Sequence, residues 1–130
     1  RLPTDEDWKK LERAMGMSQG DADAMGFRGT MEGTLLQQDV TGTGIALPLG
    51  GYAIVLGRPA TLRFRHWREF GYFWTATEEK NETPFPDAYY RKISFRSSQI
   101  ERGITRIVDS NYETNYPKHM SVRYVRDAVD

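Results

Sequence analysis

The apolar residues near the start of the chain recur with the period of an α-helix. Trp8, Leu11 and Met15 lie at positions i, i+3 and i+7 and form a single apolar stripe. Thr4 precedes this stripe as a good N-cap, because its hydroxyl can accept a hydrogen bond from a free amide of the first turn. The pattern predicts a helix over roughly residues 5–15.

A second short helix is predicted next, because Ser18 can cap it and Gly26 can end it. In the segment that follows, residues 27–38, Gly29 and Gly33 interrupt any long helix. We expect this segment to be mostly loop.

From residue 52 onward the apolar positions follow the period of β-strands. Leu62 and Phe64, for example, alternate with two arginines, which is the pattern of a half-buried strand. Arg91 falls in the apolar phase of its strand, so it must have a partner or lie at an edge. The candidate strands cover residues 52–56, 62–65, 71–77, 89–95, 100–108 and 120–124. Residues 78–87 and 109–118 are polar and are expected to form loops.

The order of these elements, with helices first and antiparallel strands after them, predicts an α+β fold. At 130 residues the chain is expected to form one domain that is large enough to bury a core. Eighteen basic and eighteen acidic residues cancel, so no overall field favours nucleic acid or an anionic membrane. No apolar run is long enough to span a bilayer, and no cysteine is present to form a disulfide or a thiolate ligand.

Four short motifs occur in order along the chain. They are R-L-P-T-x-x-x-W at residues 1–8, L-P-x-G-G-Y at 47–52, G-Y-F-W-T-A-T-E at 71–78 and S-V-R-Y-V-R-D at 121–127. Together they resemble the signatures of the Fibrobacter succinogenes major paralogous domain. This bacterial surface domain is related to the formylglycine-generating-enzyme type of C-type lectin fold. The chain departs from the family pattern at Asp7, where Glu is commoner, and at Tyr124, where the family has cysteine.

The resemblance implies a C-type lectin-like fold, in which two helices pack on a twisted antiparallel sheet with long loops on one side. In the family a segment of strands precedes the R-L-P-T motif, whereas this sequence starts at Arg1. We therefore expect the N-terminal strands to be missing and the chain to be the C-terminal part of a longer exported protein. Loss of that segment would leave the closing strand with an unpaired edge.

The resemblance does not extend to enzymatic chemistry. The related formylglycine-generating enzymes depend on cysteines that bind copper, and this chain has none. His66 and His119 lie far apart in the sequence with no ligand spacing around either of them. The calcium-binding lectin motifs E-P-N, Q-P-D and W-N-D do not occur. We expect no catalytic residue, no metal site and no cofactor.

Five residues are candidates for ligand binding: Trp67, Arg68, Tyr112, Tyr116 and His119. Trp67 lies among charged residues and has few apolar neighbours, which favours exposure as much as burial. The last three residues lie in or beside the final loop, in the half of lectin-like folds that commonly carries the variable binding surface. Tyrosine contributes contact area there at low entropic cost.

These observations favour a non-catalytic ligand-binding or adhesion domain of a bacterial surface. Its partner is expected to be an extracellular ligand, a glycan or a protein, with neither nucleic-acid binding nor membrane insertion. The expected location is the cell surface, the outer membrane or the extracellular space. Two alternatives stay open, namely a structural or assembly domain of a surface lipoprotein or appendage, and a hypervariable lectin-like receptor.

Overall fold

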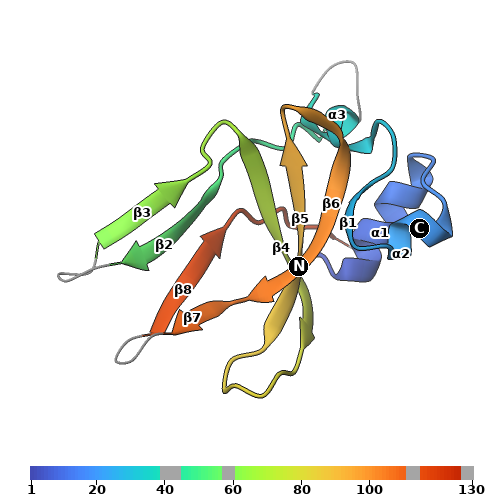
Figure 1. The fold of residues 1–130 in the computed structure, drawn as a ribbon. Helices are drawn as coiled ribbons and strands as arrows, with labels where there is room; N and C mark the ends of the chain where they lie inside the picture. Colours follow the sequence, from blue (N-terminus) through green and yellow to red (C-terminus); the bar gives the residue numbers. More distant parts are fainter. Residues whose placement is uncertain (39–44, 57–60, 111–114, 127–130) are drawn as a thin grey trace.

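The computed structural model describes residues 1–38, 45–56, 61–110 and 115–126 of the chain. The helices are α1 (Asp5–Ala14), α2 (Gln19–Asp23) and α3 (Glu32–Gln37), and they lie in the first part of the chain (Figure 1). The strands are β1 (Gly26–Arg28), β2 (Tyr52–Leu56), β3 (Thr61–Arg65), β4 (Phe70–Glu79), β5 (Asp87–Ser94), β6 (Ser97–Arg106), β7 (Val108–Ser110) and β8 (Asn115–Met120). The predicted α+β class is confirmed.

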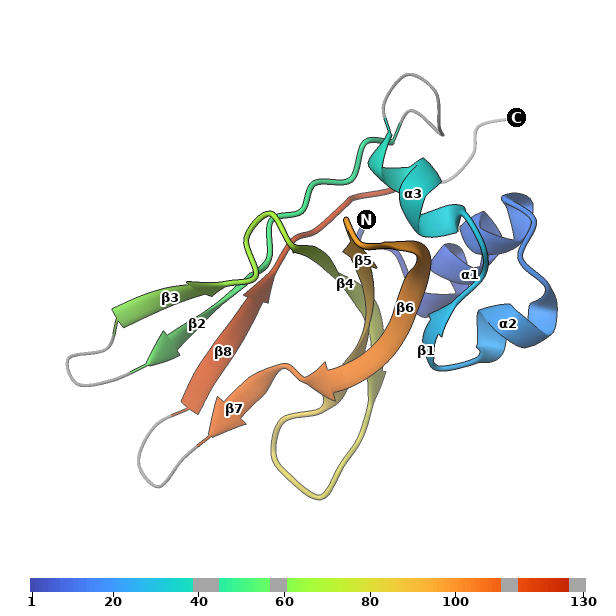
Figure 2. The ribbon, with the colours of Figure 1, turned by 45° about the horizontal axis from the view of Figure 1, so that its top comes forward.

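The described strands form two antiparallel sheets. The first has the strand order β1-β6-β5-β4, and the second has the order β3-β2-β8-β7. The helices gather beside the first sheet, while the second sheet extends away from them as an arm (Figures 1 and 2). Isolated bridges join the two sheets at β4, where Gly51 pairs with Gly71 and Ser121 pairs with Phe73. The expected fold had two helices packed on one sheet. The strands instead form two sheets, because only single bridges, and no continuous strand pairing, join β4 to the second sheet.

Helix α1 begins as its sequence predicts. The Asp7 amide donates to the Thr4 hydroxyl over 3.1 Å, and the Thr4 amide donates to the Asp7 carboxylate over 2.9 Å. This reciprocal capping box satisfies amides that the helix leaves unpaired at its first turn. Ser18 caps α2 in the same manner through the amide of Asp21, so the second predicted helix is also confirmed.

The apolar core lies between the helices and one face of the first sheet. Trp8 of α1 packs against Phe73 of β4 with ring centroids 6.0 Å apart. Burying such side chains contributes about 1.5–3 kcal/mol each and fixes α1 on the sheet. The buried cluster comprises Trp8, Met17, Ala22, Leu36, Leu47, Phe73, Ile93 and Ile100.

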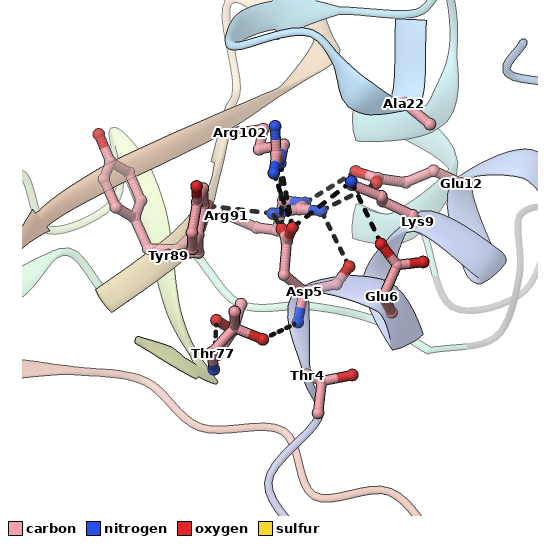
Figure 3. Close-up of polar contacts among 12 residues, drawn as sticks. Thr4, Asp5, Glu6, Lys9, Glu12, Ala22, Thr77, Tyr89, Arg91 and Arg102 are labelled. Atoms are coloured by element: carbon pink, nitrogen blue, oxygen red, sulfur yellow. Dashed lines mark hydrogen bonds and ion pairs between the residues drawn. The ribbon is translucent and has the colours of Figure 1, made fainter. Parts of the chain in front are cut away.

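Beside this core lies a buried ionic cluster that we define as Asp5, Glu12, Arg28, Arg91 and Arg102. Figure 3 shows Asp5, Glu12, Arg91 and Arg102 of this cluster. Arg91 is 0 % exposed and bridges two of the acidic residues of α1, at 2.7 Å from Asp5 and 3.0 Å from Glu12. Arg102 binds Asp5 at 2.8 Å, and Arg28 binds Glu12 at 2.7 Å. The prediction that Arg91 must find a partner is confirmed, and the partners belong to the first helix.

Backbone carbonyls add further hydrogen bonds to this buried ionic cluster. Nη1 of Arg28 donates to the carbonyl of Ile100 over 2.9 Å, and Nη1 of Arg102 donates to the carbonyl of Asp23 over 2.7 Å. These bonds tie β1, β6 and the end of α2 to the same polar centre. Buried charges need such additional hydrogen bonds, because ion pairing alone does not offset the loss of hydration.

Two segments that were predicted to be loops are regular elements instead. Residues 27–38 contain the end of β1 and all of α3. Gly33, which suggested a break, is the contact point of α3 with β6, since an added Cβ would lie 2.1 Å from the Gln99 carbonyl oxygen. Of residues 109–118, those at 109–110 and 115–118 belong to the paired strands β7 and β8, and residues 111–114 lie outside the described part of the chain. These two strands pair through their backbones, so they do not need the alternating apolar side chains by which strands are recognised.

Two strand predictions are also corrected. The strand predicted over residues 62–65 forms as β3, but its five residues are exposed rather than half-buried, because it is the outer strand of the second sheet. The closing strand predicted over residues 120–124 is wrong beyond Met120, where β8 ends. Ser121 instead turns toward β4, and Val125 exchanges hydrogen bonds of 2.6 and 2.8 Å with Arg1.

Candidate functional site

A concave surface lined by aromatic rings lies where the two sheets meet. We call it the aromatic hollow. It has a volume of about 200 Å³ and is lined by Tyr52, His66, Tyr72, Tyr90, Thr105, Lys118 and Met120. Strands β4, β5 and β6 supply lining residues from the first sheet, and β2 and β8 supply them from the second, so both sheets are needed to form it.

Strand register places these side chains on facing walls. In the first sheet Trp74 pairs with Tyr90, and Tyr90 pairs with Gly103. In the second sheet Tyr52 pairs with Met120. Paired residues project to the same side of a sheet, and neighbours along a strand project to opposite sides. Arg91, the neighbour of Tyr90, therefore points to the helices and the core, while Tyr90 faces the hollow.

A tight turn between β3 and β4 positions His66. The backbone of His66 has φ = 57°, a left-handed conformation that few side chains adopt, and Arg68 repeats it with φ = 66°. The amide of Phe70 donates to the His66 carbonyl over 3.0 Å and closes the turn. Gly51 packs directly beneath it, since an added Cβ would lie 2.0 Å from the Arg65 carbonyl oxygen. Such strain is found where surrounding structure holds a functional side chain in place.

The rings contact one another in a continuous chain. His66 Nδ1 and the Tyr72 hydroxyl form a hydrogen bond of 2.8 Å, and their rings stack with centroids 6.0 Å apart. Tyr52 meets both of them edge to face, at 5.6 Å from His66 and 5.2 Å from Tyr72. Tyr90 continues the chain at 6.2 Å from Tyr72. Each edge-to-face or offset contact contributes about 0.5–1.5 kcal/mol beyond area burial, which keeps the rings ordered.

The hydroxyls of Tyr72 and Tyr90 are held in their neutral form. Burial raises the pKa of Tyr72 above its ordinary value. Burial and the neighbouring Glu101 carboxylate raise the pKa of Tyr90 to about 12. The Tyr90 hydroxyl donates to Glu101 over 3.3 Å, and its ring lies over Gly103, where an added Cβ would be 2.4 Å away. These phenols therefore serve as hydrogen-bonding groups at neutral pH rather than as proton acceptors.

Two lysines place positive charge next to the aromatic rings. Lys92 lies over Phe70 at 4.3 Å and over Tyr72 at 5.5 Å, and it pairs with Glu101 at 3.7 Å. Lys118 lines the hollow and donates to the Thr105 hydroxyl over 2.9 Å. Ring faces and hydrogen-bonding groups thus converge on one concavity, as they do in sites for small polar ligands.

Two of the residues predicted from the sequence lie together beside this hollow. Trp67 is 63 % exposed, and the Arg68 guanidinium lies 4.2 Å from the centre of its ring. Both belong to the turn that positions His66, but their side chains do not line the hollow.

The other three predicted residues are not brought to the same place. His119 is exposed on β8 but lies between Lys118 and Met120 in the strand, so it projects from the opposite face of the sheet. Tyr116 lies in β8 and pairs with Asp109. Tyr112 lies outside the described residues.

Sequence reasoning missed the residues that line the hollow. Tyr52, Tyr72 and Tyr90 were assigned to strands, but the faces they share depend on pairing between distant segments. One signal was present in the sequence, since Tyr90 precedes Arg91, which the strand pattern places in the apolar phase. Neighbouring residues of a strand project from opposite faces, so Tyr90 had to project from the face opposite to Arg91.

The described part of the chain contains no group of three or more His, Asp or Glu side chains placed to hold a metal ion. Nor does any helix in it have the length and apolar character that crossing a bilayer requires.

Comparison with known proteins gives one match. The family model described as the Fibrobacter succinogenes major domain matches residues 1–126, which is nearly the whole chain. No curated protein and no solved structure matches the chain.

Proposed function

The chain belongs to the Fibrobacter succinogenes major domain family, and from that premise we propose that it is a non-catalytic ligand-binding domain of a bacterial cell surface. The ligand is an extracellular glycan or protein segment, and the aromatic hollow binds it. We assign the fold, on the same proposal, to the C-type lectin-like class. The domain is accordingly exported, either to the outer membrane and cell surface or to the extracellular space.

The observation that carries this proposal is the convergence of rings and hydrogen-bonding groups in the aromatic hollow. The Tyr52, Tyr72 and Tyr90 rings provide apolar faces, and Tyr72 and Tyr90 also provide neutral hydroxyls. His66 and Lys118 add further polar groups at the lining. Tyrosine-rich surfaces bind by combining large rigid contact area with a polar edge, and they lose little conformational entropy on binding.

The first test is a screen of the protein against arrays of glycans and of peptides, with the strongest ligand then titrated by calorimetry. We expect Tyr52→Ala to weaken binding of that ligand about tenfold, because a stacking face in contact with the ligand is lost. We expect Tyr90→Phe to weaken it about fivefold, since one hydrogen bond contributes about 1 kcal/mol.

The matched control is Tyr89→Phe. Tyr89 is the neighbour of Tyr90 in β5, and its hydroxyl also donates to a glutamate, Glu79, but it projects from the opposite face. This variant should bind the ligand as the wild-type protein does. A ligand whose affinity is unchanged by both Tyr52→Ala and Tyr90→Phe, in variants that unfold at the wild-type temperature, would exclude the aromatic hollow as its site.

One observation favours the assembly alternative. The outer strand of the second sheet, β3, is exposed along its length and carries apolar side chains. Exposed strands of this kind join proteins by strand addition. The hypervariable-receptor alternative rested on residues 111–116, of which 111–114 lie outside the described part of the chain.

A further inference from the structure

Strand β3 forms an edge of the second sheet. It pairs with β2 over five consecutive residues, from Thr61 opposite Leu56 to Arg65 opposite Tyr52. Among the described residues no other strand pairs with it. Figures 1 and 2 both show β3 as the outermost strand of the arm, on the side away from the helices. Its outer backbone groups are therefore placed to pair with a further strand.

The two faces of β3 differ sharply in chemistry. Leu62 and Phe64 share one face and are 49 % and 67 % exposed. Arg63 and Arg65 share the other face, and the ion pairs of the described residues do not include either of them. Natural edge strands usually carry charged side chains, a proline or a bulge that prevents unselective pairing, and in β3 the two arginines are the charged side chains. The described residues of β3 contain no proline, and their pairing with β2 is unbroken.

A shallow hollow adjoins the apolar face of this edge. Its volume is about 190 Å³, and its lining includes Phe64, Ala53 and His119. These three residues form one row across β3, β2 and β8, since Ala53 pairs with both of the others. An apolar side chain beside Phe64 on an added strand would extend this row and cover the hollow.

The charge pattern disfavours a second copy of the chain as the added strand. In an antiparallel pair of β3 strands, matching Leu62 with Phe64 sets the two copies of Arg63 opposite each other. Matching Phe64 with its own copy sets Arg63 opposite Arg65, and matching Leu62 with its own copy leaves Phe64 and Arg65 beyond the end of the facing β3 strand. Like charges directly opposite in a sheet are destabilising, whereas opposite charges stabilise the pair.

We propose that the β3 edge binds an extended segment of another protein in which apolar and acidic residues alternate. The segment adds to the second sheet beside β3, with its apolar residues next to Leu62 and Phe64. Its acidic residues then lie beside Arg63 and Arg65. Backbone hydrogen bonds between the segment and β3 give the affinity, and the alternation of apolar and acidic side chains gives the specificity. This site lies along the outer edge of β3, next to the aromatic hollow, since Arg65 pairs with Tyr52. Its proposed partner does not depend on the function proposed for the hollow.

The probe is a synthetic nonapeptide of alternating valine and glutamate with blocked ends, compared with the same peptide carrying lysine in place of glutamate. Binding to the wild-type protein is measured by fluorescence anisotropy. Amide hydrogen exchange then locates the contact. We expect the glutamate peptide to bind at least tenfold more tightly than the lysine peptide. The amides of residues 62–65 should exchange more slowly when it is bound.

The decisive variant is the double reversal Arg63→Glu with Arg65→Glu, which should invert the preference so that the lysine peptide binds more tightly. Both side chains are exposed, so the fold should be retained, and thermal unfolding checks this. Lys10→Glu, a reversal of an exposed charge on α1, is the matched control and should leave the preference unchanged. Equal binding of the two peptides, protection elsewhere than β3, or dimerisation of the protein through β3 would each overturn the proposal.

Discussion

Arg91 is fully buried, so its charged guanidinium group requires carboxylates beside it, which Asp5 and Glu12 provide. Three arginines and two carboxylates make up the buried ionic cluster, and each carboxylate binds two guanidinium groups. Burying so many charges offers little net stability compared with an apolar core, but removing one partner leaves the others without compensation. Each member of the cluster is therefore more important to the fold than its own contacts suggest.

Glu12→Gln tests this at the residue scale. The substitution keeps the shape of the side chain but leaves Arg28 and Arg91 with one buried negative charge fewer, so we expect unfolding free energy to fall by about 3–5 kcal/mol. Urea denaturation measures the change. Glu6→Gln, on the same helix, removes an exposed carboxylate that lies 3.3 Å from Lys9, and it should cost less than about 1 kcal/mol. Similar losses in both variants would contradict the central role of the cluster.

At the scale of elements, the helices differ in how closely they approach the sheet. Helix α3 lies against β6 with so little space that Gly33 contacts the backbone of Gln99 directly. Helix α2 lies at the surface, and an added Cβ at Gly20 would have no atom within 4 Å. Glycine at position 33 thus permits close packing of α3, whereas glycine at position 20 makes no such contact. Only the packing of each helix distinguishes the two positions.

The paired substitutions Gly33→Ala and Gly20→Ala test this difference. Gly33→Ala should lower unfolding free energy by about 1–3 kcal/mol, because the added methyl group forces α3 away from β6. Gly20→Ala should raise it by about 0.5–1 kcal/mol, since alanine restricts the unfolded chain and favours the helix. Thermal or urea unfolding of both variants measures the effects. Tolerance of alanine at Gly33 would show that α3 is not packed against β6 in this way.

The elements that sequence analysis predicted correctly are those determined locally. Thr4 and Ser18 cap helices through amides three residues away, so the caps are visible in the sequence itself. Helix α3 was missed because Gly33 serves a contact with β6, a strand more than sixty residues further along the chain. The position of Arg91 in its strand showed that a partner was needed. It did not identify Asp5, which lies 86 residues away.

The candidate site was harder to predict for the same reason. Trp67 was recognised as a candidate because its neighbours are charged, which is a local property. Tyr52 and Tyr72 meet because their neighbours Gly51 and Gly71 form a bridge between the two sheets, which Ser121 and Phe73 reinforce with a second bridge. No short-range pattern encodes these bridges, so the aromatic hollow follows from the topology of both sheets together.

At the scale of the whole molecule, the ionic cluster ties the first helix to the first sheet and makes stability depend on pH. Burial by itself raises the pKa of Asp5, but hydrogen bonds and charges from Arg102 and Arg91 outweigh it and hold the pKa below its ordinary value of 3.8. Hydrogen bonds from Arg1 and Thr4 likewise lower the pKa of Asp7 at the start of α1. Both carboxylates are thus more acidic in the folded state than in the unfolded chain.

A lowered folded-state pKa stabilises the protein fully at pH values above the unfolded value, and the stabilisation is lost as the pH falls through the folded value. We therefore expect unfolding free energy to be level well above pH 3.8 and to decline as the medium is acidified below it. Urea titrations between neutral and strongly acidic pH measure this. Asp7→Asn should be less stable than the wild-type protein at neutral pH, and the difference should shrink as Asp7 becomes protonated. A difference that stays constant down to the most acidic pH tested would mean that the charge of Asp7 does not stabilise the start of α1. Asp7 would then have to act through shape and hydrogen bonding alone.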